Sequence, residues 1–121
     1  MSTLRITVWS ENVHEHTSAK VKKVYPYGMH AAIAAGLLKF LPSAKVTTAT
    51  LQEPEHGLSA ERLRDTDVLT WWGHKAHDLV SDEVVARVRQ MFLATGFTSG
   101  LVHGQPVPSY KDIEITVGTP P

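Results

Sequence analysis

Asp-Val-Leu-Thr-Trp-Trp-Gly-His-Lys-Ala-His-Asp, residues 67–78, is the stretch that decides the fold predicted for this 121-residue chain. Its first part, residues 68–72, is a short and almost wholly apolar run between a polar turn and Gly73. Such a run is too short for a helix and is typical of a strand buried on both faces of a parallel sheet. His74, His77 and Asp78 follow in one loop. Because ligands of open α/β sheets bind beyond the carboxyl ends of the strands, this loop is a candidate active-site edge.

The segments around this stretch alternate between strand and helix patterns. Strands are predicted over residues 4–9, 44–51 and 100–103, from their β-branched and apolar residues. Helices are predicted over residues 29–41, 60–64 and 81–94, with a short helical piece near residues 18–24. Ser59 and Ser81 are expected to cap two of these helices. The alternation predicts right-handed βαβ units and an α/β fold with a parallel sheet, in a flavodoxin-like order that places the first strand beside the third.

Composition narrows the class of protein. Twelve basic and twelve acidic side chains cancel, so nothing in the charge favours a nucleic acid or an anionic membrane surface as a partner. The absence of cysteine excludes thiol nucleophiles and disulfides, and fits a reducing compartment. No segment has the layout of a signal peptide or the length of a membrane span, so a cytoplasmic protein is expected. No Gly-rich phosphate-binding motif is present, so no nucleotide cofactor is expected.

Histidine is the one unusual count, with seven in the chain. In the parallel arrangement all seven follow or end strands, or begin a helix at the same edge of the sheet: His14, His16, His30, His56, His74, His77 and His103. The loops after the first and third strands would then bring His14, Glu15 and His16 near the loop at residues 74–78. Trp72, the residue nearest that loop, is a candidate for stacking on a flat ligand, although burial is the more common use of tryptophan.

Two other interpretations of these residues stay open. Each single histidine is also compatible with a purely local or solvated role, since polar groups collect in loops. Histidine and carboxylate ligands suit a divalent metal, so a metal site is open as well, with its ligands unknown. A serine nucleophile has less support, because the chain contains no Gly-x-Ser-x-Gly motif.

Several blocks of sequence resemble the trehalose-utilisation, or ThuA-like, family. The blocks are Trp9 with His14-Glu15, then Tyr25-Pro26-x-Gly28-x-His30-x-Ala32-Ile33, then Thr48-Ala49-Thr50-Leu51-x-Glu53-Pro54-Glu55-His56-Gly57-Leu58, and Asp67-Val68-Leu69-x-Trp71-Trp72-Gly73-His74-x-Ala76-His77-Asp78. They occur in the family's order between about Leu4 and Arg89. The resemblance implies a fold similar to class I glutamine amidotransferases, a flavodoxin-like three-layer α/β sandwich. Glutaminase activity is not expected, because that mechanism uses a cysteine.

The resemblance also implies a division of the chain. Residues 1–103 correspond to the amino-terminal part of the family domain, and residues 104–121 form a divergent tail in which residues 113–117 alternate like an edge strand. Family members are longer, so the sheet is expected to be incomplete. An unpaired sheet edge would favour association, which leaves a homo-oligomer open.

For function, the resemblance implies a protein that acts on or binds a disaccharide or its oxidised derivative. In an enzymatic version His74, His77 or His16 would act as acid or base near neutral pH, and Asp78 or Glu15 would orient an imidazole or hold a substrate hydroxyl. His14, His30 and His56 would line the sugar site, and Trp72 with Tyr25 would form its stacking wall. A non-catalytic carbohydrate-binding or regulatory module, a metal-dependent hydrolase and an incomplete chain without its own function are the alternatives.

Overall fold

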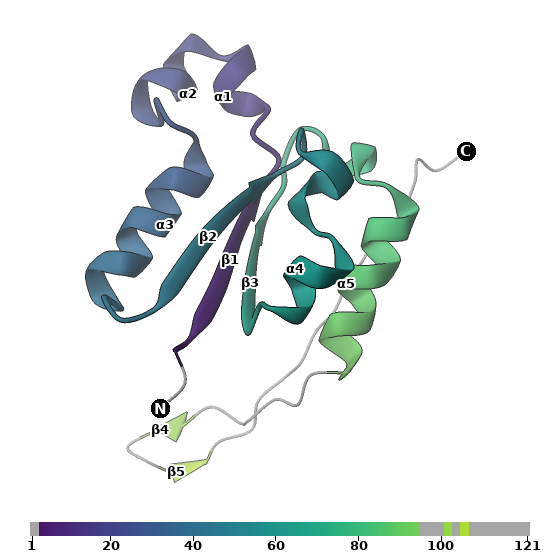
Figure 1. The fold of residues 1–121 in the computed structure, drawn as a ribbon. Helices are drawn as coiled ribbons and strands as arrows, with labels where there is room; N and C mark the ends of the chain where they lie inside the picture. Colours follow the sequence, from purple (N-terminus) through teal and green to yellow (C-terminus); the bar gives the residue numbers. More distant parts are fainter. Residues whose placement is uncertain (1–2, 95–100, 103–104, 107–121) are drawn as a thin grey trace.

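The computed structural model of the chain describes residues 3–94, 101–102 and 105–106. Its centre is a three-stranded parallel sheet in the order β2-β1-β3, built from β1 (Arg5–Ser10), β2 (Lys45–Thr50) and β3 (Val68–Trp72) (Figure 1). The expected contact between the first and third strands is therefore confirmed. In this register Ser10 lies opposite both Thr50 and Trp72, so all three strands reach the same carboxyl edge together.

Helices cover both faces of the sheet. The chain forms α1 (His14–Thr17), α2 (Ala19–Val24), α3 (Met29–Phe40), α4 (Ala60–Arg64) and α5 (Asp82–Ala94), with single 3₁₀ turns η1 (Pro54–Gly57) and η2 (His77–Leu79). Helix α3 packs on one side against β1 and β2, and α4 and α5 lie on the other side (Figure 1). No helix in the described ranges has both the length and the apolar character of a membrane span.

Two sequence-based expectations differ from this structure. Residues 14–17 were expected to belong to a long loop, but they form α1, a single turn without a capping side chain or an apolar repeat that would have revealed it. The fourth strand was expected to continue the parallel set, but β4 (Leu101–Val102) pairs antiparallel with β5 (Gln105–Pro106) in a separate two-stranded sheet. The alternating segment at residues 113–117 and His103 lie outside the described residues.

The main hydrophobic core lies between the sheet and the helices α4 and α5. Trp9, in the middle of the sheet, is fully buried there and stacks on Trp71 of β3, with ring centroids 3.9 Å apart. Other buried members of the core are Ala49, Leu58, Leu63, Leu69, Val80, Val84 and Val88. The Trp9 indole N–H donates to the backbone oxygen of His56 at 2.9 Å. The largest core side chain therefore also satisfies its one polar group.

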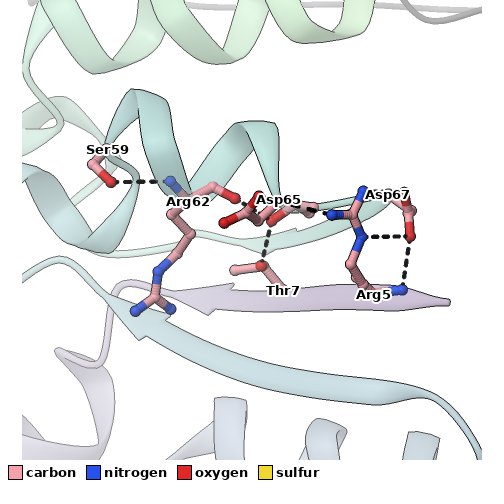
Figure 2. Close-up of polar contacts among 7 residues, drawn as sticks. Arg5, Thr7, Ser59, Arg62, Asp65 and Asp67 are labelled. Atoms are coloured by element: carbon pink, nitrogen blue, oxygen red, sulfur yellow. Dashed lines mark hydrogen bonds and ion pairs between the residues drawn. The ribbon is translucent and has the colours of Figure 1, made fainter. Parts of the chain in front are cut away.

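The amino edge of the sheet is held by ion pairs of Arg5, the first residue of β1, with Asp67, which directly precedes β3, and more distantly, at 3.8 Å, with Asp65 (Figure 2). The Arg5 guanidinium donates to both carboxylate oxygens of Asp67, at 2.9 and 3.1 Å, and the Arg5 backbone N–H donates to Asp67 at 2.9 Å. This fork-shaped pairing is the strong form of an arginine–carboxylate contact. The hydrogen bonds from the Arg5 side chain and backbone lower the pKa of Asp67 from 3.8 to about 2.

The Arg5–Asp67 pair predicts a specific loss of stability in acid. Asp67 has its ordinary pKa of 3.8 when unfolded and about 2 when folded, so its stabilising effect is complete above this window and disappears as the pH falls through it. Asp67→Asn should therefore lower the free energy of unfolding at neutral pH and make it fall less steeply between about pH 4 and about pH 2. Urea unfolding of both proteins across this range tests the prediction. Parallel pH profiles for the two would contradict it.

Candidate functional site

The carboxyl edge of the sheet brings together residues from the loops that follow β1 and β3. The rings of His14 and His74 lie 5.4 Å apart between centroids, and the Trp72 and His74 rings 5.8 Å apart. His14 and Trp72 are half-buried, whereas His74 is exposed to solvent. The sequence-based expectation that these two loops meet is therefore confirmed for this group of rings, named here the His14–His74–Trp72 cluster.

Glu11, a residue that the sequence analysis did not select, holds this edge together. Its side chain is 0% exposed, and its carboxylate accepts backbone N–H groups of Lys75 and, at 2.8 Å, of Ala76. Its own backbone N–H donates to the oxygen of Trp72 at 3.2 Å. The first residue after β1 is thus bonded to the loop that carries His74. Its position at the end of the central strand, where loops converge, is the signal that could have identified it.

The charge on Glu11 is stabilised by these same hydrogen bonds. Burial acts to raise the pKa of Glu11, but backbone hydrogen bonds from Lys75, Ala76 and His74, together with the charge of His74, lower it below its usual value. The carboxylate therefore stays ionised beneath the loop. A buried negative charge that is satisfied by backbone donors fixes those donors in place, because leaving it unpaired would cost several kcal/mol.

Glu15 joins α1 to the start of α3. Its side chain is 2% exposed, and Oε2 accepts the backbone N–H of Met29, the first residue of α3, at 2.9 Å. A carboxylate in this position bonds an otherwise unpaired N–H and complements the positive end of the helix. The other oxygen, Oε1, is buried and has no hydrogen-bond partner among the described residues. Because this oxygen is closed off from solvent, it offers no contact to a ligand at the surface of the carboxyl edge.

His30 is positioned by a turn that requires glycine. Its Nδ1 lies 3.1 Å from the hydroxyl of Ser10, the last residue of β1, which is fully buried. The preceding Gly28 has φ +95°, and a Cβ atom there would lie only 2.3 Å from Cε1 of the His30 ring. The bare backbone of Gly28 therefore makes room for the imidazole. Ser10 is a second contact residue that the sequence analysis did not select.

His56, predicted to bind substrate, has both ring nitrogens engaged with the backbone. Nδ1 lies 2.8 Å from the oxygen of Leu51, and Nε2 accepts the N–H of Ser81 at 3.0 Å, just before α5. Since Nε2 accepts this hydrogen bond and the Leu51 oxygen can only accept, Nδ1 is the nitrogen that donates, to Leu51. Within the described ranges no ring contact joins His56 to His14 or His74. Its geometry is that of a structural link between η1 and α5.

The remaining predicted residues lie at the surface of this region. His16, His77 and Asp78 are exposed and Tyr25 is half-buried. In the described part of the chain their side chains make no hydrogen bond or ion pair, so the fold leaves them available to a ligand. No group of three His, Asp or Glu residues in that same part is arranged to hold a metal ion.

A cavity of about 370 Å³ lies near the opposite, amino edge of the sheet. It is bordered by Arg5, Thr7, Lys45, Thr47, Arg62 and Thr66, among others, and none of the predicted site residues lines it. The hydroxyls of Thr7 and Thr66 bond each other at 2.7 Å (Figure 2). The Arg62 guanidinium donates to the backbone oxygen of Thr48 at 3.0 Å. Much of this polar lining is thus occupied in joining β1 and β2 to α4. The carboxyl edge, with its free donors and acceptors, is the better candidate site.

No protein-family model matches the sequence, and a search of curated proteins finds no match either. What this site does must therefore be inferred from its own residues.

Alanine substitutions at Gly28, in the turn before His30, and at Gly36, within α3, should have opposite effects on stability. Gly28→Ala should destabilise the protein by about 1–3 kcal/mol, because alanine is strained at positive φ and would displace the His30 ring. Gly36→Ala is the matched control, since Gly36 lies inside α3 with nothing within 4 Å of a new Cβ. That change should stabilise the helix by about 0.5–1 kcal/mol. Urea unfolding measures both, and equal effects would contradict the prediction.

Replacing Glu11 should lower the stability of the protein and disturb the geometry of the candidate site. Glu11→Gln should cost about 1–3 kcal/mol, because a buried amide would leave backbone donors of the loop unpaired. Glu61→Gln, an exposed carboxylate on α4, should change stability by no more than about 0.5 kcal/mol. The imidazole NMR signals of His14 and His74 should shift in Glu11→Gln and stay in place in the control. Unchanged stability and signals in Glu11→Gln would show that the loop does not depend on Glu11.

Proposed function

We propose that this chain is a ThuA-like protein of trehalose utilisation, which holds a disaccharide or its oxidised derivative at the carboxyl edge of the sheet. The observation that carries the proposal is the His14–His74–Trp72 cluster, which the fold assembles from two loops far apart in the sequence. The strand order β2-β1-β3, with helices on both faces, supports the finer assignment to a flavodoxin-like fold similar to class I glutamine amidotransferases.

The chemistry of the cluster suits a sugar. Aromatic and imidazole rings offer flat apolar faces for the C–H surfaces of a pyranose, and ring nitrogens exchange hydrogen bonds with hydroxyls. His30, in the first turn of α3, contacts Ser10 at the end of β1, and Tyr25, which follows α2, is proposed as part of the stacking wall. A few polar groups beside aromatic walls are the usual pattern of a small-molecule site.

In the enzymatic form of this proposal, the site also catalyses a reaction of the bound sugar. In it His74 is the acid or base, since it is solvent-accessible and lies over the loop that Glu11 fixes. His77, Asp78 and His16 would complete the reacting group from the rim. One observation favours a binding module instead. A general base is usually oriented by a third group, and within the described residues no side chain hydrogen-bonds to the His74 ring.

Calorimetric titration with trehalose tests the proposal. Saturable binding is expected, and His74→Ala should weaken it by about tenfold or more through loss of a central ring contact. Lys23→Ala, an exposed residue of α2, is the control and should bind like the parent. A parallel assay for loss of trehalose separates the enzyme from the binding module. Failure of trehalose and its oxidised derivatives to bind the folded protein would overturn the proposal.

A further inference from the structure

Positive and negative charges are distributed unevenly along the chain. Residues 16–52, which include α2, α3 and β2, contain no aspartate and no glutamate. The same segment carries five lysines, all of them exposed and none of them in an ion pair among the residues that the structure describes: Lys20, Lys22, Lys23, Lys39 and Lys45. The net charge of zero, which gave no reason to expect an anionic partner, therefore averages over one strongly basic region.

Helix α3, in the middle of this region, lacks a polar face. Only His30 and Lys39 are polar in its sequence MHAAIAAGLLKF, and no residue of the helix is buried. Large apolar side chains are exposed around both of its ends, above all Tyr27 at 84% and Phe40 at 78%. A helix at the surface of a globular protein usually turns polar residues to the solvent. The outer side of α3 therefore has the composition of a covered surface.

Basic and apolar side chains lie next to one another at the two ends of α3. At the carboxyl end Lys39 stands between the exposed Leu38 and Phe40, and its ammonium group is 5.7 Å from the centre of the Phe40 ring. At the amino end the exposed Val24 directly follows two lysines. The exposed side chains of residues 20–24, 27 and 38–41 are named here the α2–α3 surface. Figure 1 shows α3 on the opposite side of the sheet from α4 and α5.

We propose that the α2–α3 surface binds a bilayer that contains anionic phospholipids. The exposed apolar side chains enter the boundary between headgroups and acyl chains, and the lysines reach the charged groups of the lipids. Helix α3 then lies parallel to the bilayer. No residue of this surface belongs to the His14–His74–Trp72 cluster, so the proposal is independent of the proposed sugar site.

The composition of the surface favours a bilayer over other anionic partners. The cations of residues 16–52 are all lysines, which act as point charges, and none is an arginine, whose fork suits paired contacts with the phosphates of a nucleic acid. Exposed leucine and phenylalanine side chains find an apolar phase in a bilayer but none on a phosphate backbone. A two-fold pair of this chain through the same surface would set lysines against lysines, because the surface contains no carboxylate.

Co-sedimentation with vesicles tests the proposal. The parent chain should bind vesicles of phosphatidylcholine and phosphatidylserine at least about tenfold more tightly than vesicles of phosphatidylcholine alone. Added salt should weaken this binding, because it screens the attraction. Absence of binding to the phosphatidylserine vesicles would overturn the proposal. Tighter binding to polyglutamate or to duplex DNA than to these vesicles would also overturn it, since the surface would then belong to an acidic protein or a nucleic acid.

The position of the lysines, and not the net charge of the chain, should decide the affinity. Lys22→Glu combined with Lys23→Glu should weaken binding to the phosphatidylserine vesicles by about 100-fold. Arg64→Glu combined with Arg89→Glu changes the net charge equally at exposed positions of α4 and α5, and this control should bind like the parent. Equal weakening by the two double variants would overturn the proposal.

The apolar part of the contact has its own test. Phe40→Ser should weaken binding to the same vesicles by about tenfold. Leu79→Ser removes an exposed apolar side chain of η2 and should leave the binding unchanged. Because the Phe40 and Leu79 side chains are 78% and 64% exposed, both variants should fold, which circular dichroism establishes. Binding that is the same in Phe40→Ser and the parent would contradict entry of the apolar side chains into the bilayer.

A single introduced cysteine reports on the depth of the surface in the bilayer, because the chain has no other cysteine. Tyr27→Cys labelled with a polarity-sensitive fluorophore should shift its emission to the blue on phosphatidylserine vesicles. Leu79→Cys with the same label is the control and should keep its emission. Equal shifts at both positions, or a shift at Leu79→Cys alone, would show that another surface faces the bilayer.

Discussion

The arrangement of the candidate site depends on one buried carboxylate. Glu11 emerges from the end of the central strand, fully removed from solvent, and is satisfied by backbone N–H groups of the loop after β3. A carboxylate in such a place can stay charged only while those donors point at it. The loop therefore has little freedom at residues 75 and 76, and His74 is held near His14. Because the buried charge is stable only with these donors in place, Glu11 fixes the geometry of the carboxyl edge.

The two edges of the sheet are tied by carboxylates in different ways. At the amino edge, Asp67 pairs with Arg5 at a partly exposed position, where water and salt weaken the attraction. At the carboxyl edge, Glu11 has neutral backbone partners in a site closed to water. Both contacts join β1 to β3. Together they explain how a sheet with few strands keeps its third strand in register at both ends.

The candidate site and the outer edge of β3 both include residues of β3. They differ in the groups that have no partner within the described part of the chain. The site offers side-chain groups, namely the rings of the His14–His74–Trp72 cluster. The edge offers backbone groups and the apolar side chains of Val68 and Trp71. A small polar molecule suits the first set.

The local pattern of the sequence determined the elements, while tertiary contacts decided which polar residues form the site. Residues 68–72 are strand β3 as predicted, but Val68 and Trp71 are exposed, so the strand is not buried on both faces. Helices α3 and α5 match their predicted ranges within one residue, and Ser59 and Ser81 accept the N–H groups of Arg62 and Val84 as capping residues do. These features follow from periodicity and short-range hydrogen bonds, which a sequence displays directly. Strand order followed too, because parallel βαβ connections leave few arrangements. The roles of Glu11, Ser10 and His56 did not follow, since their partners lie up to 65 residues away in the chain. A buried carboxylate and a solvated one look the same in sequence, and only the packed fold determines which donors each one meets.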